Sequence, residues 1–171
     1  MARKIQATHI DIGKTALREG FVLGIDTHRN SKIADLKRIS DWICKCLREV
    51  KGAVIIEGHY ASAVVPKRSV RLVIVLRCNP DELMKRLKKR RLTTRKLREN
   101  LAAEVLDICL VDALGTFGRK RICEIDTTRR TLKSTLNEVA GLLDGRIKPT
   151  YGNVDWLSRL EERGDRLMIL N

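Results

Sequence analysis

Two short apolar runs near the middle of the chain dominate its pattern of hydrophobic and polar positions. The first covers residues 53–56 and the second residues 72–76, and each ends abruptly in polar residues. Both runs are too short for a typical helix and are rich in β-branched residues, which favours strands. Neither run alternates apolar with polar residues. We therefore expect both strands to be buried on both faces, as in a parallel sheet covered by helices.

The rest of the pattern adds two strands and several helices. Strands are expected over residues 5–12 and 122–126, which makes four in all. Residues 20–31 have a loop-like composition. Helices are predicted by their apolar spacing and capping residues over 32–50 after Ser31, from Asn79-Pro80 onward, over 95–114 after Thr93-Thr94, and from Thr131 to Gly145. Strands that alternate with helices indicate an α/β fold with a mainly parallel sheet.

Length and composition are typical of one globular domain spanning residues 1–171. No apolar run approaches the roughly 20 residues of a membrane span, and the N-terminus lacks the apolar core of a secretion signal. Membrane partners are therefore not expected. The five cysteines are an odd number and show no zinc-type spacing, which favours reduced thiols in a reducing compartment.

A strongly basic charge balance points to polyanionic partners. The net charge is +14, and residues 85–98 hold nine Lys and Arg but no acid. Nucleotides, RNA or a ribosomal surface fit this charge. With only six aromatic residues, a base-stacking platform is not expected. A solvated basic surface with no specific partner remains the alternative.

Ligands of parallel sheets bind outside the carboxyl ends of the strands. This rule selects Glu57, His59 and Arg77, together with the basic segment that follows. A carboxylate at position 57 could hold a hydrated Mg²⁺ against nucleotide phosphates, and His59 could orient water or a phosphate. The alternative is an ordinary polar strand end beside a solvated helix face.

The tripeptide Gly13-Lys14-Thr15 matches only the end of a phosphate-binding P-loop. The full pattern, G-x-x-x-x-G-K-[ST], requires glycine at position 8, where this chain has Thr8. A single glycine cannot supply the nest of backbone N–H groups that surrounds a phosphate. The tripeptide is therefore not interpreted as a P-loop, and no P-loop is identified in the sequence.

Several of these segments together match one known family. They are residues 55–59, 73–77, 86–90, 97–100 with Glu104, 107–114 and 154–157. On these residues the chain resembles the atypical adenylate kinases of archaea and eukaryotes, which include adenylate kinase isoenzyme six and are linked to maturation of small-subunit ribosomal RNA. The similarity spans nearly the whole chain. It implies a three-layer α/β fold of the P-loop nucleoside-monophosphate-kinase type.

The resemblance also implies roles for individual residues. Glu57, which would hold the metal through water, and His59 occupy a Walker-B-like motif that usually reads Asp-x-His. Arg90 matches the lid arginine that contacts ATP, and Arg86 and Asp11 are further nucleotide-binding candidates. The monophosphate-binding segment would cover about 11–35, the lid about 89–99 and the C-terminal tail 146–171. Glu in place of Asp, and Arg91-Leu92 in place of Gly-Tyr, depart from the family pattern.

By the same resemblance the reaction is ATP + AMP to two ADP with Mg²⁺, with ATPase activity as a further expectation. A small-subunit ribosomal protein and rRNA are the implied partners. The implied location is cytoplasmic, or nuclear in a eukaryote. Family members begin with a strand and a P-loop, so about 20 residues would be missing here, and we expect this chain to be a weak or inactive catalyst. The alternative function is a non-catalytic basic assembly factor that binds a ribosomal protein or rRNA.

Overall fold

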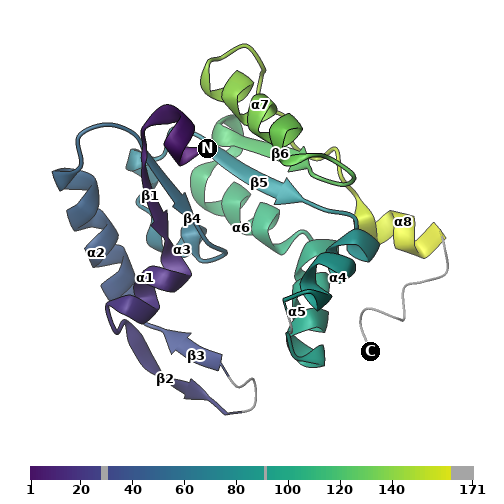
Figure 1. Ribbon diagram of the computed structural model, residues 1–171, viewed down its shortest axis with the longest axis horizontal. Helices are drawn as coiled ribbons and strands as arrows, with labels where there is room; N and C mark the ends of the chain where they lie inside the picture. Colours follow the sequence, from purple (N-terminus) through teal and green to yellow (C-terminus); the bar gives the residue numbers. More distant parts are fainter. Residues whose placement is uncertain (28–30, 91, 163–171) are drawn as a thin grey trace. The chain divides into compact units, whose positions relative to one another are not determined.

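The computed structural model describes residues 1–27, 31–90 and 92–162, and the chain divides into two compact units, Met1–Arg71 and Leu72–Asn171 (Figure 1). Each unit contains one pair of parallel strands. In the first unit β1 pairs with β4, and in the second β5 pairs with β6. The predicted α/β class with parallel strands is confirmed.

The first unit combines its parallel pair with an antiparallel hairpin and three α-helices. Its elements are a 3₁₀ helix Ala2–Ile5, β1 (Thr8–Asp11), α1 (Ile12–Arg18), β2 (Val22–Asp26), β3 (Ser31–Ala34), α2 (Leu36–Glu49), β4 (Val54–Glu57), α3 (Ala61–Val64) and a 3₁₀ helix Lys67–Ser69. Ile39 and Ile43 of α2 are fully buried, and Ile10, Ile12 and Val64 are nearly so. The apolar stripe predicted for this helix therefore faces the core.

Two predictions for the first unit were wrong. Part of the segment expected to be a loop forms the antiparallel hairpin β2–β3, although residues 28–30 lie outside the described part of the chain. Ser31 pairs with Asp26 in this hairpin and so cannot cap a helix. The cap of α2 is Asp35, whose side chain accepts a hydrogen bond from the backbone N–H of Arg38 at 3.0 Å.

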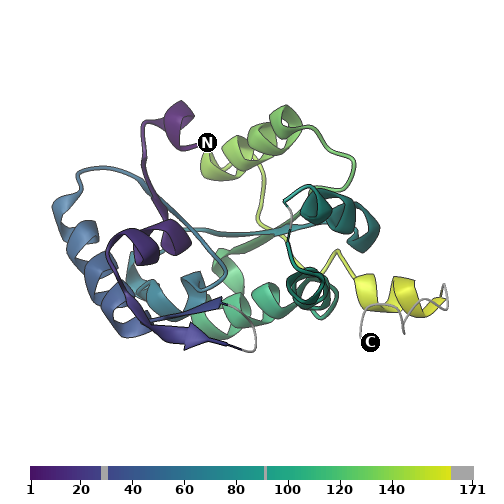
Figure 2. The same cartoon turned by 60° about the horizontal axis from the view of Figure 1, so that its bottom comes forward.

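The second unit encloses its parallel pair between helices. Its elements are β5 (Val73–Arg77), α4 (Pro80–Lys88), α5 (Thr94–Val105), α6 (Ile108–Phe117), a 3₁₀ helix Arg119–Arg121, β6 (Ile122–Asp126), α7 (Leu132–Leu143) and α8 (Trp156–Glu162). Helices α6 and α7 lie on opposite faces of β5 and β6 (Figures 1 and 2). Burial on both faces, predicted for residues 72–76, holds only in part, because Val75 of β5 is buried but Leu76 is 56% exposed.

Caps decide where the helices of the second unit begin. The predicted caps at Asn79 and Thr131 are confirmed, since each side chain accepts a backbone N–H bond in the first turn. The single helix predicted over 95–114 was wrong, because α5 and α6 are separated at Leu106 and Asp107. Asp107 adopts a left-handed conformation with φ of 56°, which aspartate tolerates better than most residues. Its carboxylate pairs with Arg77.

Two further observations concern membranes and thiols. Among the described helices, none has the length and apolar character needed to cross a bilayer. All five cysteines are free. The expectation of unpaired thiols is therefore confirmed.

The corrected start of α2 can be tested by removing its cap. Asp35→Ala should lower the free energy of unfolding by about 1 kcal/mol, because the first turn loses an acceptor for its backbone N–H groups. Ser31→Ala is the matched control and should change it by less than about 0.5 kcal/mol. Urea unfolding followed by circular dichroism measures both. An equal or larger loss in Ser31→Ala would restore the original prediction.

Candidate functional site

The carboxyl ends of β1 and β4 bring two acids side by side in the first unit. Asp11 and Glu57 are register partners in this parallel pair, so both close the same edge of the sheet. Asp11 also caps α1. Its carboxylate accepts the backbone N–H of Lys14 at 3.0 Å and pairs with the Lys14 ammonium at 3.0 Å. These two bonds lower the pKa of Asp11.

Glu57 has a partner that the sequence did not single out. Nε2 of His9 lies 3.2 Å from Oε1 of Glu57, and the Glu57 side chain is 59% exposed. Alternation along β1 puts His9 and Asp11 on one face, and the register puts Glu57 beside Asp11. The period-2 pattern of residues 8–12 was the available signal for this histidine.

His59 follows Glu57 after a turn that requires glycine. Gly58 has φ of 145°, and a Cβ there would lie 3.0 Å from Cβ of Ile12. This close approach packs the turn onto the start of α1. The His59 ring lies 4.0 Å from the Tyr60 ring, and burial lowers the pKa of His59. No hydrogen bond joins His59 to Glu57 among the described residues.

The tripeptide Gly13-Lys14-Thr15 lies inside α1. Thr15 is buried, and the backbone N–H of Lys14 is taken by Asp11. A helical backbone with that N–H already bonded does not form an anion nest.

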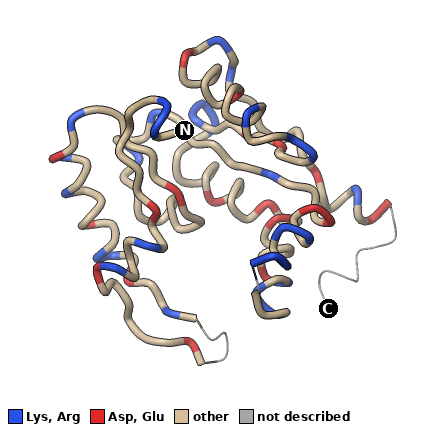
Figure 3. The backbone as a smooth tube through the Cα atoms, in the orientation of Figure 1, with Lys and Arg blue, Asp and Glu red and all other residues tan. Residues whose placement is uncertain are grey.

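Basic residues recur along α4 and α5 in the second unit (Figure 3). Arg86 donates to the backbone oxygen of Thr127 at 3.1 Å and to its hydroxyl oxygen at 3.3 Å, and it pairs with Glu82. It is thereby held at the carboxyl end of β6. Arg90 is exposed just beyond the end of α4. Position 91, one of the two departures from the family pattern in the lid, lies outside the described residues.

Arg77 is not available to a ligand, which corrects its selection from the sequence. Its side chain is 2% exposed and pairs with Glu104 at 2.9 Å, and with Asp107 and Glu124. Burial alone would lower its pKa, but the carboxylates more than offset this, and the pKa of Arg77 is raised. The partners come from 27 to 47 residues further along the chain, so no local pattern could reveal them.

A magnesium ion is implied by the family, and the geometry of the first unit is compatible with one. In the described ranges no three His, Cys, Asp or Glu side chains converge on a metal position. Mg²⁺ in nucleotide sites usually keeps several waters and uses only one or two carboxylates. Glu57, whose carboxylate is exposed at a strand end, is the residue that would hold such an ion through water.

Comparisons with known proteins agree with this geometry. A family model described as "AAA domain" matches residues 1–107. A relative from Methanothermobacter thermautotrophicus is 36% identical over 147 residues, which is 86% of this chain and 81% of the relative. One from Archaeoglobus fulgidus is 42% identical over 120 residues, 67% of this chain and 63% of the relative. One from Methanococcus maripaludis is 31% identical over 148 residues, which is 86% of this chain and 77% of the relative. Each relative is named "Putative adenylate kinase".

Parallel strands with helices between them, together with the matched domain, define an α/β protein of the nucleoside-monophosphate-kinase type. The chain belongs to the AAA domain family and to the adenylate kinase-like family of these archaeal relatives. This supports kinase-type nucleotide chemistry with nucleotides as substrates.

The buried position of Arg77 predicts a large loss of stability on its removal. Arg77→Met leaves Glu104 and Glu124 buried without their counter-charge, which should cost about 3–5 kcal/mol of unfolding free energy. Arg95→Met is the control. Arg95 pairs with Glu99 at 3.2 Å on the exposed face of α5, and its loss should cost under about 1 kcal/mol. Equal losses in the two urea titrations would contradict the assignment.

Burial of the His59 ring predicts a titration below the ordinary value of 6.5. Protons then bind the unfolded chain more readily than the folded one. The free energy of unfolding should fall as the pH drops from the unfolded pKa to the folded pKa. Proton NMR of the ring signals measures the pKa, and His59→Gln identifies the signal and should remove this part of the pH dependence. A His59 titration at or above 6.5 would refute the prediction.

Proposed function

We propose that this protein is an adenylate kinase-type phosphotransferase that converts ATP and AMP to two ADP, with ATP hydrolysis as a side activity. One observation carries the proposal: Asp11 and Glu57 are register partners at the carboxyl ends of two parallel strands. The relatives of the chain are named "Putative adenylate kinase". Residues 1–171 are proposed to act as one kinase domain, with the monophosphate segment at about 11–35, the lid at about 89–99 and the C-terminal tail at 146–171.

Each candidate residue has a proposed role that follows from its chemistry. Glu57 would hold a hydrated Mg²⁺, which supplies positive charge to the phosphate oxygens of bound ATP. His59, whose depressed pKa keeps it neutral near pH 7, would bond a water or a phosphate oxygen. Arg86 and Arg90 would bind phosphoryl oxygens through their guanidinium groups. Asp11 would orient the monophosphate segment, because it fixes the start of α1.

The rate of this chain is expected to be low. No G-x-x-x-x-G-K-[ST] pattern occurs within the 171 residues, and the β- and γ-phosphates are held mainly by that loop in P-loop enzymes. The remaining carboxylate and arginine groups still provide binding and charge stabilisation.

A second candidate is a non-catalytic assembly factor, favoured by the net charge of +14 and the basic α4–α5 segment. Its proposed partners are a small-subunit ribosomal protein or rRNA, and its proposed location is the cytoplasm, or the nucleus in a eukaryote. Binding to RNA through phosphates would weaken steeply with salt, in proportion to the number of phosphates contacted.

The experiment compares the 171-residue chain with three variants. ADP formation from MgATP and AMP is followed by ³¹P NMR, and MgATP affinity by calorimetry. Glu57→Gln and Arg90→Ala should each lower the rate or the affinity at least about tenfold, since each removes a charge that faces phosphate. Arg119→Ala, an exposed arginine in the 3₁₀ helix before β6, should leave both unchanged.

A wild-type chain that neither forms ADP nor binds MgATP would overturn the kinase proposal. If the same chain bound single-stranded RNA with a steep salt dependence, the assembly-factor alternative would hold instead. A rate equal to that of a full P-loop kinase would refute the expected low activity.

A further inference from the structure

One carboxylate oxygen joins three parts of the second unit. Oε1 of Glu104, on α5, accepts hydrogen bonds from Nε of Arg77 at 2.9 Å, the backbone N–H of Cys78 at 3.0 Å and Nε1 of Trp156 at 2.9 Å. The backbone oxygen of Glu104 also accepts from Arg77 at 2.9 Å. The end of β5, the last turn of α5 and the first residue of α8 therefore meet at a single group.

A second acid attaches the segment that leads into α8. Oε2 of Glu124, on β6, accepts the backbone N–H groups of Gly152 at 2.9 Å and Asn153 at 3.1 Å. The backbone N–H of Glu124 donates to the oxygen of Thr150 at 2.8 Å. The other oxygen of Glu124 pairs with Arg77. Residues 150–156 are thus bonded to two of the acids that surround Arg77.

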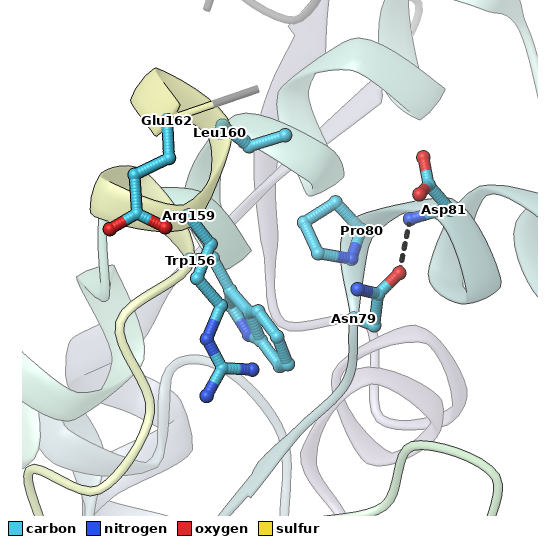
Figure 4. A pocket seen from close by; sticks show the side chains of 7 residues that line it. All are labelled: Asn79, Pro80, Asp81, Trp156, Arg159, Leu160 and Glu162. Carbon is cyan, nitrogen blue, oxygen red and sulfur yellow. Dashed lines mark hydrogen bonds between the residues drawn. The ribbon is translucent and has the colours of Figure 1, made fainter. Parts of the chain in front are cut away.

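Helix α8 is also seated by apolar contacts on α5. Trp156 and Leu160, which are 2% and 6% exposed, form one buried cluster with Leu101 and Val105 of α5. Trp156 and Leu160 line a pocket of about 290 Å³ together with Pro80, the first residue of α4 (Figure 4). Leu83 and Met84 of α4 pack against the same cluster, so the segment 150–162 contacts both α4 and α5.

Glu104 also links the two helices that flank the proposed lid. Helix α4 starts at Pro80, two residues after Cys78, and α5 ends at Val105, one residue after Glu104. Between them the chain carries the basic residues 85–98. The hydrogen bond from Cys78 to Glu104 therefore joins the approach to α4 to the last turn of α5.

We propose that Trp156 and Glu104 are positioning residues, and that residues 150–162 act as a strap that fixes the base of the α4–α5 arm. Arg86 is held separately by Thr127 and Glu82, so the strap acts on the arm that presents Arg90 to the nucleotide. This inference rests on the proposed function, because the role of residues 89–99 as a nucleotide lid belongs to it.

The physical basis is the bond between the indole and a partly buried carboxylate. A hydrogen bond to a charged group contributes more than one between neutral groups, and its loss leaves the acceptor with one donor fewer in a water-poor site. Segments held by few such bonds open locally without global unfolding. Removing the indole N–H should therefore increase local opening of α4 and α5, while the opening of β5 and β6 stays unchanged.

The test uses the full 171-residue chain with Trp156→Phe, which keeps an aromatic ring but lacks the N–H donor. Hydrogen exchange should become about tenfold faster or more in α4 and α5, with β6 and the first unit unchanged. Affinity for MgATP should fall by a similar factor. Trp42→Phe, in α2 of the first unit, is the matched control and should change neither quantity.

Two results would overturn the inference. One is exchange that accelerates by the same factor in α4, α5 and β6, which would show a loss of general stability. The other is a looser arm with unchanged MgATP affinity. The exchange measurement needs no nucleotide, so it remains informative if the kinase proposal fails. A wild-type chain that does not bind MgATP would overturn the proposed function instead.

Discussion

The second unit depends on one buried cation and the acids that neutralise it. Arg77 is almost fully enclosed, and so is its partner Glu124, while Glu104 is 14% exposed. Charges removed from water must be paired and hydrogen-bonded, or the fold loses several kcal/mol. Because the acids come from α5 and β6, satisfying Arg77 fixes those two elements against the end of β5. The same acids also bind residues 150–156, so this approach to α8 is part of the bonded core of the unit.

In the first unit, by contrast, two acids lie at the edge of the parallel strand pair. Asp11 and Glu57 end adjacent parallel strands whose apolar residues anchor the unit. Each carboxylate has a basic neighbour, Lys14 for the first and His9 for the second. Such an edge provides partly solvated carboxylates, which suit a hydrated divalent cation and phosphate chemistry. In the proposed function, this edge is where a hydrated Mg²⁺ would be held.

Sequence patterns succeeded where the cause of a structure is local. The caps at Asn79 and Thr131 depend on neighbouring residues and were predicted. So were the strand at 122–126 and, one residue early at 72–76, the strand that the structure has at 73–77. The hairpin β2–β3 was missed because its glycine content is typical of a loop. The pairing of its two strands depends on residues that are separated along the chain. The break between α5 and α6 was missed because it is stabilised by the ion pair of Asp107 with Arg77, which lies about 30 positions earlier in the chain.

The sequence alone determined the α/β class, the basic character of residues 85–98 and the acid–histidine turn at 57–59, because each follows from residue type and short-range spacing. Only the tertiary structure decided that Arg77 is buried, that His9 contacts Glu57, and that Trp156 is bonded to Glu104. These depend on which distant elements pack together. Packing is governed by the summed burial and charge pairing of the folded chain, and no local window of sequence contains that sum.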